Sequence, residues 1–238
     1  SAGSFVANPF SVAADKTVTF SPGNLQYHAA SNEWRFAPNQ TDYIGEVNEN
    51  ISSTYNGWID LFGWGTGNNP TNRSTDYDDY RTFVDWGVNK IGNDAPNTWR
   101  TLTIDEWIYI LKKRYNYDRL IGIAEVKGVK GLILLPDGWI CPSGVIFKSG
   151  LHDDEYYTEY QTFNSSEWDE LEASGAVFLP LVGRNSTSNV NEVLYRSRYW
   201  SSSPYGSAES LSFKINTARV RGENDARYDA YFVRLVQD

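Results

Sequence analysis

The chain has 238 residues, of which 40% are hydrophobic, so it is long enough for one large domain or two small ones with a substantial core. Its net charge of −9 argues against nucleic acid as a partner, because nucleic-acid binding requires a basic surface. No run of about 18 apolar residues is present, so we expect no membrane span in this sequence. No leader segment is recognisable, which says nothing about export.

Cysteine and histidine are scarce, which limits the catalytic sites that this sequence could build. Cys141 is the only cysteine, so neither a disulfide framework nor a multi-cysteine metal site is expected. It lies in the apolar sequence LPDGWICPSG, where we expect a buried structural thiol rather than a nucleophile. A Ser-His-Asp triad would need His28 or His152, and no GxSxG turn supports either.

The first 40 residues predict a β meander. Turn residues separate three short runs with strand composition: Thr17–Phe20, Leu25–Tyr27 and Trp34–Phe36. His28 follows the second run, and we expect it to be a surface histidine at a strand end. The meander is expected to pack on, or to extend, a main domain that covers residues 41–238.

A long loop region is predicted from Asn39 to Asn97, where Gly, Asn, Asp, Ser and Thr dominate. Loops of this length inside a compact domain are usually functional or are held in place by their own side chains. Aromatic residues at short intervals favour the second case. They are Trp58, Phe62, Trp64, Phe83 and Trp86.

Two acidic clusters offer oxygen atoms that Ca²⁺ prefers as ligands. One comprises Asp76, Asp78 and Asp79, and the other comprises Asp153, Asp154 and Glu155. Neither has the spacing of an EF-hand loop. We therefore interpret both as solvated loop charge and predict no calcium dependence.

Two helices have clear start signals. Thr103 and Glu106 have the spacing of a capping box, and apolar residues then recur at helical intervals over a helix from Thr103 to Tyr115. They are Ile104, Trp107, Ile108, Leu111 and Tyr115. Asn164 caps a second helix that runs to about Ala173 and is closed by Gly175.

Two apolar runs predict buried strands. Gly131–Leu135 is ended by a Pro-Asp-Gly turn, and Val177–Val182 contains Pro180, which requires an edge strand or a bulge. Short antiparallel strands together with two helices indicate an α+β fold.

The stretch from Tyr199 to Asp238 has the most regular pattern. Leu211, Phe213 and Ile215 alternate with polar residues, which predicts a half-buried strand. Tyr231–Val236 is apolar at both parities, which predicts a closing strand covered on both faces. We expect turns at Ser201–Ser207 and at Gly222–Asp225.

Charge distinguishes this stretch from the rest of the chain. From Arg196 onward the chain has seven Lys or Arg and five acids, which is a local net charge of +2. Because the whole chain has a net charge of −9, residues 1–195 together carry −11. A face with mixed charges and aromatic residues on an acidic body is typical of a recognition surface. An ordinary solvated sheet face would have the same composition.

The terminal motifs resemble a known group of proteins. The sequence YWSSSP, an LxFxIN-type strand and RYxxxxVRLV are similar to the C-terminal region of proteins diversified by bacterial and phage retroelements, the group that includes the phage major tropism determinant. Earlier in the chain, NISSTYNGWIDLFGWGTGNNP, DWGVNKI and NTWRTLTIDEW resemble the body of secreted or surface proteins of gut anaerobes in the same group. The resemblance implies a C-type-lectin-like fold, close to that of the formylglycine-generating enzyme.

In this group the frame residues stay fixed while interspersed positions vary to bind different ligands. For this chain the resemblance implies a variable-type ligand-binding set within residues 199–238: Tyr205, Ser207, Glu209, Ser212, Lys214, Asn216, Arg219, Arg221, Glu223, Asn224, Asp225, Asp229 and Tyr231. Tyr205, Tyr231, Arg219 and Arg221 are the expected anchors, because Tyr and Arg dominate interface hot spots. The same frame also fits an undiversified relative with a fixed surface.

We therefore expect a non-enzymatic ligand-binding protein, displayed on a cell surface or a phage particle, with a protein or glycan ligand and no cofactor. One alternative is a carbohydrate-binding module with exposed aromatics such as Trp58, Trp64 and Trp86. The other is a degenerate enzyme of the formylglycine-generating type, although the related oxidase uses a pair of active-site cysteines and this chain has Cys141 alone.

Overall fold

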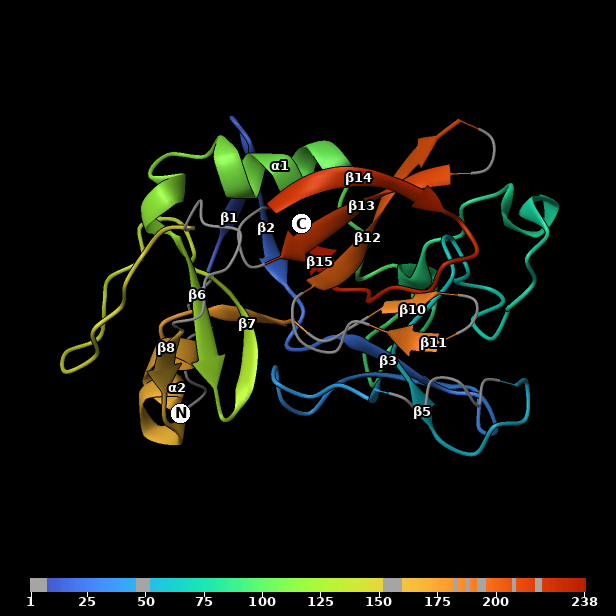
Figure 1. The fold of residues 1–238 in the computed structure, drawn as a ribbon, viewed down its shortest axis with the longest axis horizontal. Helices are drawn as coiled ribbons and strands as arrows, with labels where there is room; N and C mark the ends of the chain where they lie inside the picture. The colour runs from blue at the N-terminus through green and yellow to red at the C-terminus, as the bar shows by residue number, and fades with distance from the viewer. Residues whose placement is uncertain are drawn as a thin grey trace.

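The computed structural model describes residues 8–45, 52–151, 160–181, 184–186, 189–191, 196–206, 209–216 and 220–238. Within these ranges the chain is a mixed α+β structure with two α-helices and several small sheets, most of them antiparallel (Figure 1). The expected α+β class is confirmed at this level. Neither α-helix in these ranges has the length and apolar character that crossing a membrane requires.

One sheet joins residues that are far apart in the sequence. Strands β1 (Phe10–Ala13) and β2 (Lys16–Phe20) form an antiparallel pair, and β15 (Val236–Gln237) pairs with the other edge of β2. Val236 also exchanges backbone hydrogen bonds of 2.8 and 2.9 Å with Arg100. The N-terminal segment therefore shares a sheet with the last described residues.

A second sheet contains the other two strands predicted near the N-terminus. Its central strand, β3 (Leu25–His28), pairs with β4 (Glu33–Phe36) and β5 (Trp58–Ile59). The three predicted strands are thus confirmed, and His28 lies at the end of β3. They do not form one continuous meander, because β2 and β3 belong to different sheets.

The loop region is held by its own aromatic side chains, as predicted. Phe62, Trp64 and Trp86 are at most 2% exposed and belong to one hydrophobic cluster with Trp200 and Tyr231. Phe83 is half-buried and packs against this cluster. Two short 3₁₀ helices, Tyr77–Tyr80 and Trp86–Val88, are the helical turns within the described part of the loop region.

Helix α1 (Ile104–Lys112) begins where the capping box predicts. The Thr103 hydroxyl accepts from the Glu106 amide at 3.2 Å, and the Glu106 carboxylate accepts from the Thr103 amide at 3.0 Å. The prediction that Tyr115 extends the apolar face is wrong, because the helix ends at Lys112 and the Tyr115 side chain is 88% exposed. Arg114 is buried there instead and donates to the Ile110 carbonyl at 2.8 Å.

A four-stranded sheet follows α1 and a 3₁₀ turn, Tyr117–Arg119. Its order is β8 (Gln161–Phe163), β6 (Ile121–Val126), β7 (Val129–Leu134) and β9 (Val177–Pro180), and β6 and β8 are parallel. The strands predicted at Gly131–Leu135 and Val177–Val182 correspond to β7 and β9. Pro180 lies on the edge strand β9, as its missing amide requires.

Helix α2 (Ser165–Ala173) precedes β9 and confirms the second helix prediction. The Asn164 side chain accepts from the Glu167 amide at 2.9 Å, and the Glu167 carboxylate accepts from the Asn164 amide at the same distance. Gly175 follows the helix with φ of +101°, in the left-handed region that favours glycine.

The C-terminal part forms a hairpin and a three-stranded antiparallel sheet. The hairpin is β10 (Arg184–Ser186) with β11 (Asn189–Asn191), and the sheet is β12 (Arg196–Tyr205), β13 (Glu209–Asn216) and β14 (Val220–Ala226). Of the two turns predicted in this stretch, the one at Ser201–Ser207 is confirmed only at its end, at Gly206, and the one at Gly222–Asp225 is wrong. Strand β12 continues to Tyr205 through an irregularity between Trp200 and Pro204, and Gly222–Asp225 lies within β14, because ladder pairing overrides the local turn preference.

The segment Tyr231–Val236 is buried throughout, as the pattern predicts. Its regular strand is limited to β15, because the segment changes partners along its length: Tyr231 bridges Phe62, and Phe232 bridges Tyr199. Most of this segment is thus a buried extended stretch between two sheets.

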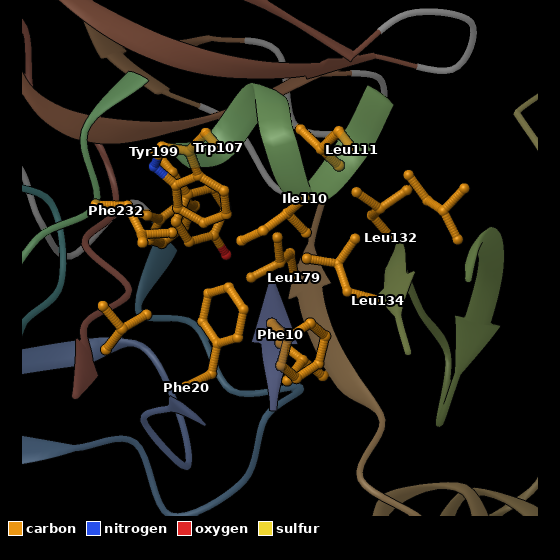
Figure 2. Packing of buried hydrophobic residues seen from close by; sticks show 14 of the residues in the cluster. Phe10, Phe20, Trp107, Ile110, Leu111, Leu132, Leu134, Leu179, Tyr199 and Phe232 are labelled. Carbon is orange, nitrogen blue, oxygen red and sulfur yellow. The ribbon is translucent and has the colours of Figure 1, made fainter. Parts of the chain in front are cut away.

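The largest hydrophobic cluster lies beneath α1 (Figure 2). Trp107 and Ile110 of α1 meet Phe20 of β2, Tyr199 of β12 and Leu179 of β9 there, and all five side chains are buried. Helix α1 therefore connects the N-terminal sheet, the four-stranded sheet and the C-terminal sheet through one core.

Candidate functional site

The register of the β12–β13–β14 sheet decides which predicted ligand-binding positions lie together. Residues directly opposite each other in an antiparallel pair share one face of the sheet. Ser212 pairs with Glu223, and Lys214 pairs with Arg221. Asn216 is in the same alternating set along β13. Asp225, opposite Ser210, belongs to this set as well. Six of the expected positions therefore share a face by strand position: Ser212, Lys214, Asn216, Arg221, Glu223 and Asp225.

The opposite face of this sheet lies against α1. Phe213 pairs with Gly222, and a Cβ atom added to Gly222 would lie 3.0 Å from Cγ1 of Ile104. Tyr199 also pairs with Phe213, and its ring centroid is 6.1 Å from that of Trp107. The period-two pattern of Leu211, Phe213 and Ile215 thus corresponds to the face that α1 covers.

Asp225 is an expected site residue that the structure places inside. It is 8% exposed, and its carboxylate accepts from the guanidinium of Arg198, which is 6% exposed. The guanidinium carbon of Arg198 also lies 5.6 Å from the centroid of the Tyr231 ring. The expectation that Asp225 contacts a ligand is therefore wrong, because its carboxylate is used to compensate a buried cation.

Tyr231 is also wrong as a binding anchor. Its side chain is fully buried, with its ring centroid 4.5 Å from that of Trp200. Its hydroxyl donates to the carboxylate of Asp229 at 3.1 Å, so Asp229, a half-buried member of the expected set, is also used inside the protein. Burial raises the pKa of Tyr231 well above its ordinary value. The apolar run Tyr231–Val236 had predicted this burial, whereas the resemblance had placed Tyr231 in the binding set.

The other expected positions lie elsewhere. Tyr205 pairs with Glu209, and Asn224 pairs with Leu211. By register, the expected positions Tyr205, Glu209 and Asn224 therefore lie on the side of the sheet that faces α1, near the end where β12 turns into β13. The Tyr205 side chain is 53% exposed, and Asn224 is exposed as well. Ser207 and Arg219 lie outside the described residues. The expected set is thus divided between two faces.

Arg227 is a structural residue of this region that the sequence did not reveal. Its guanidinium is 4% exposed and donates to the carbonyls of Tyr80 and Gly206, each at 3.0 Å. It also lies 4.3 Å from the centroid of the Trp64 ring. Arg227 therefore connects the turn after β12 to the loop region. Tyr205, the last residue of β12, directly precedes that turn.

Arg196 and Arg198 were also absent from the expected set. They pair with Asn216 and Lys214, so both lie by register on the face of β12–β13–β14 opposite α1. The alternation of Arg196 and Arg198 with Ser197 and Tyr199 in the sequence was the signal that could have identified them.

The residues of the alternative functions do not form sites. Trp64 and Trp86 are 2% and 0% exposed, so they cannot form the exposed ladder of a carbohydrate-binding module. Trp58 is half-buried under the guanidinium of Arg35, at 3.7 Å from the ring centroid.

Cys141 is exposed, so the expectation of a buried thiol is wrong. Its sequence neighbours are apolar, but the segment that follows β7 runs over the surface, and Ile140 and Ile146 are more than 80% exposed. The Cys141 thiol donates to the Val145 carbonyl at 3.2 Å.

The first acidic cluster has local partners. Asp76 accepts from the Asp78 amide at 3.0 Å, and Asp78 pairs with Arg81 at 2.7 Å. Asp153, Asp154 and Glu155 lie outside the described residues, as does His152. Among the residues that the structure describes, no group of three or more His, Cys, Asp or Glu side chains could hold a metal ion.

Comparison of the chain with protein-family models, curated proteins and solved structures gave no match. The candidate site is therefore defined by its own geometry. It comprises positions on the face of β12–β13–β14 opposite α1, which we call the polar face: Arg196, Ser212, Lys214, Asn216, Arg221 and Glu223. Arg198, Trp200 and Asp225 lie on the same face by register, but they are buried.

Proposed function

We propose that this protein is a non-enzymatic ligand-binding protein with a C-type-lectin-like scaffold, whose binding surface is the polar face of β12–β13–β14. It would be displayed outside a cell or on a phage particle, as in the group that the terminal motifs resemble. The observation that carries the proposal is the strand register, which gathers six of the thirteen expected positions on one face, of which Asp225 is buried.

The anchoring of β12 supports the proposal, because two of its frame residues, one on each face of the strand, hold it firmly. The Trp200 indole donates to the Phe62 carbonyl at 2.6 Å, and the Tyr199 hydroxyl donates to the Asn24 side chain at 3.2 Å. Both residues belong to the YWSSSP frame and are at most 1% exposed. A surface with exchangeable side chains needs such a fixed support, so that ligand affinity can change while the fold stays the same.

The order of elements also supports the scaffold assignment. Helices α1 and α2 both precede the C-terminal strands in the chain, as the lectin-like fold would require. The mixed α+β architecture and the small antiparallel sheets agree with it at a coarse level.

The experiment that tests this function separates binding from folding. If the polar face is a binding surface, the variant Ser212→Ala/Lys214→Ala/Asn216→Ala/Arg221→Ala should keep the melting temperature of the wild type within about 3 °C, because substitutions outside the core cost little. Trp200→Ala should lose about 3–5 kcal/mol of unfolding free energy, because it removes a buried indole. Thermal unfolding followed by circular dichroism measures both. A large loss of stability in the fourfold variant would show that the polar face serves the fold, and would contradict the proposal.

A further inference from the structure

The β4–β3–β5 sheet has one face that the proposed function does not use. Gln26 pairs with Arg35, and His28 pairs with both Glu33 and Trp58, so these five residues share a face. The alternate residues of the three strands pack inward, in or against a hydrophobic cluster. In the view of Figure 1, β3 and β5 lie on the side of the molecule away from α1 and the C-terminal sheet. This face is therefore separate from the polar face of β12–β13–β14.

Arg35 lies across this face with its terminal nitrogens unused. Its guanidinium carbon is 3.7 Å from the centroid of the Trp58 ring, and its Nε donates to the Gln26 side-chain oxygen at 2.8 Å. Neither terminal nitrogen has an acceptor among the described residues, and both reach the surface. The other arginines with buried or half-buried side chains in the described ranges each donate to an oxygen from a terminal nitrogen: Arg73, Arg100, Arg114, Arg198, Arg227 and Arg234. Arg35 is the exception within these ranges.

The Gln26 side chain supplies a second unused donor next to Arg35. Gln26 is 2% exposed, and its side-chain oxygen accepts from Arg35, which fixes the orientation of the amide. The amide nitrogen has no acceptor in the described part of the chain, yet it reaches the surface. Buried polar side chains are normally hydrogen-bonded. The donors of Gln26 and Arg35 therefore form a site that lacks an acceptor.

The surrounding charges favour a ligand with a single negative charge. Burial lowers the pKa of Arg35, and the charge of Asp42 offsets this only in part. The Asp42 carboxylate accepts from the Asn39 amide at 2.9 Å. Glu33, on the same face of the sheet as Arg35, is exposed. Two acids near one cation would repel a dianion, whereas a monoanion would compensate the half-buried guanidinium.

We propose that Arg35 and Gln26 bind the carboxylate of a small organic acid. A carboxylate is planar and accepts two parallel hydrogen bonds from the terminal nitrogens of a guanidinium. Trp58 holds the guanidinium by a cation–π contact, so Arg35 loses less conformational freedom when the ligand binds. Simple acids and acidic sugars share this carboxylate chemistry. The site goes beyond the proposed function and does not depend on it.

An NMR titration of the ¹⁵N-labelled protein tests the inference and distinguishes the two sources of the carboxylate. Sodium propionate, sodium D-glucuronate and sodium methyl sulfate are added at constant ionic strength, and the backbone amide signals of β3, β4 and β5 are followed. We expect saturable shifts with propionate, and binding of methyl sulfate at least about threefold weaker, because its oxygens are not coplanar. Binding of D-glucuronate about tenfold tighter than propionate would support the inference for an acidic sugar, and similar affinities would support it for the carboxylate alone. No saturable shift with either carboxylate, or tighter binding of methyl sulfate, would overturn it.

Two variants locate the binding at Arg35 and Gln26. Arg35→Lys keeps the charge but loses the planar pair of donors, so propionate should bind about tenfold or more weakly. Gln26→Glu places a carboxylate of nearly the same shape beside Arg35 and should abolish the shifts by compensating the guanidinium internally. Circular dichroism checks that each variant is folded. The control Arg119→Lys, at an exposed position, should bind like the wild type.

The outcomes separate this site from the polar face. Propionate affinity unchanged in Arg35→Lys, or lowered equally in Arg119→Lys, would overturn the inference. The polar-face variant Ser212→Ala/Lys214→Ala/Asn216→Ala/Arg221→Ala should bind propionate like the wild type, because its substitutions lie on another sheet. Loss of propionate binding in that variant would also overturn the inference. Failure of the proposed function, which is measured by the stability of the same variant, would leave the carboxylate site unaffected.

Discussion

The buried guanidinium of Arg234 donates to the side-chain oxygen of Gln40 at 2.7 Å, although the two residues are 194 positions apart. Arg234 also donates to the carbonyls of Ser21 and Phe178, at 3.1 and 3.0 Å. The same Gln40 oxygen accepts from the Phe178 amide at 2.8 Å. One arginine thus connects the N-terminal segment, β9 and the C-terminal segment. Burial lowers the pKa of Arg234 to about 10.

Replacing Arg234 by Met should destabilise the fold by about 3 kcal/mol or more. The carbonyl oxygens of Ser21 and Phe178 would lose this donor, and the Gln40 oxygen would keep only the Phe178 amide. Each unsatisfied buried group costs about 1–3 kcal/mol. Urea unfolding of Arg234→Met measures the loss. Arg119→Met, at an exposed position, is the control and should change stability by less than about 0.5 kcal/mol. A similar midpoint for the two variants would show that Arg234 is not a structural link.

Gly87 should not tolerate a larger side chain. A Cβ atom at this position would lie 1.7 Å from the Trp99 carbonyl oxygen, so the short helix Trp86–Val88 would have to move away from the segment that leads into α1. We expect Gly87→Ala to lose about 3 kcal/mol or more of unfolding free energy, at or above the upper end of the usual overpacking cost. Gly128→Asn is the matched control, because Gly128 has φ of +78° with open space around it and Asn accepts that conformation. Denaturant unfolding of both variants decides the prediction, which fails if Gly87→Ala is as stable as the control.

The Arg227 guanidinium should be necessary for the order of the turn after β12. Arg227→Ala would leave the carbonyls of Tyr80 and Gly206 without this donor and remove the contact with Trp64, so we expect a loss of about 2–4 kcal/mol. Amide hydrogen exchange should accelerate at Tyr205, at Gly206 and in residues 77–80 more than in β6 and β7. Uniform acceleration across the protein would mean that Arg227 acts only on global stability.

Alkaline pH should destabilise the protein through its buried tyrosines. Burial raises the pKa of Tyr80 to about 12, and it raises the pKa values of Tyr199 and Tyr231 further. A tyrosine in the unfolded chain ionises near pH 10. Each of these groups therefore contributes stability that is fully present below about pH 10 and is lost as the pH rises through the folded-state pKa. Arg73 and Arg234, whose pKa values burial lowers to about 10, act in the opposite direction in that range.

Comparing variants isolates the contribution of one tyrosine from that of the arginines. The free energy of unfolding, measured between pH 9 and about 12, should fall less steeply for Tyr231→Phe than for the wild type. Tyr115→Phe should keep the wild-type slope, because its side chain is 88% exposed. Identical slopes for all three proteins would contradict a raised pKa for Tyr231.

The parts of the fold that depend on neighbours in sequence could be predicted. Both helices begin at the predicted caps because Thr103 with Glu106, and Asn164 with Glu167, form reciprocal bonds within four residues. The alternation of Leu211, Phe213 and Ile215 with polar residues predicted the correct face of β13, because side chains alternate between the two faces of any strand. Such signals are local and need no partner.

The errors concern contacts between distant residues. Gly222–Asp225 looks like a turn in sequence, yet β13 supplies cross-strand partners that hold it as a strand. Asp225 looks like an exposed polar position, and only the return of the chain beside β12 buries it next to Arg198. Tyr231, which the resemblance placed in the binding set, is buried against Trp200, as its apolar run predicted. The thiol of Cys141 shows the converse error, since apolar neighbours predicted burial for a segment that runs over the surface. Composition alone cannot decide these cases.

The pairing of β2 with β15 has a consequence for protein synthesis. Val236 lies opposite Phe20, so a ribosome must add more than 200 residues before the second edge of β2 finds its strand. Until then that edge, with Phe20 among its residues, stays available to other nascent chains. This sheet should therefore be completed only after residue 236 has left the ribosome, and chaperones that shield open strand edges should raise the yield more than slower translation does.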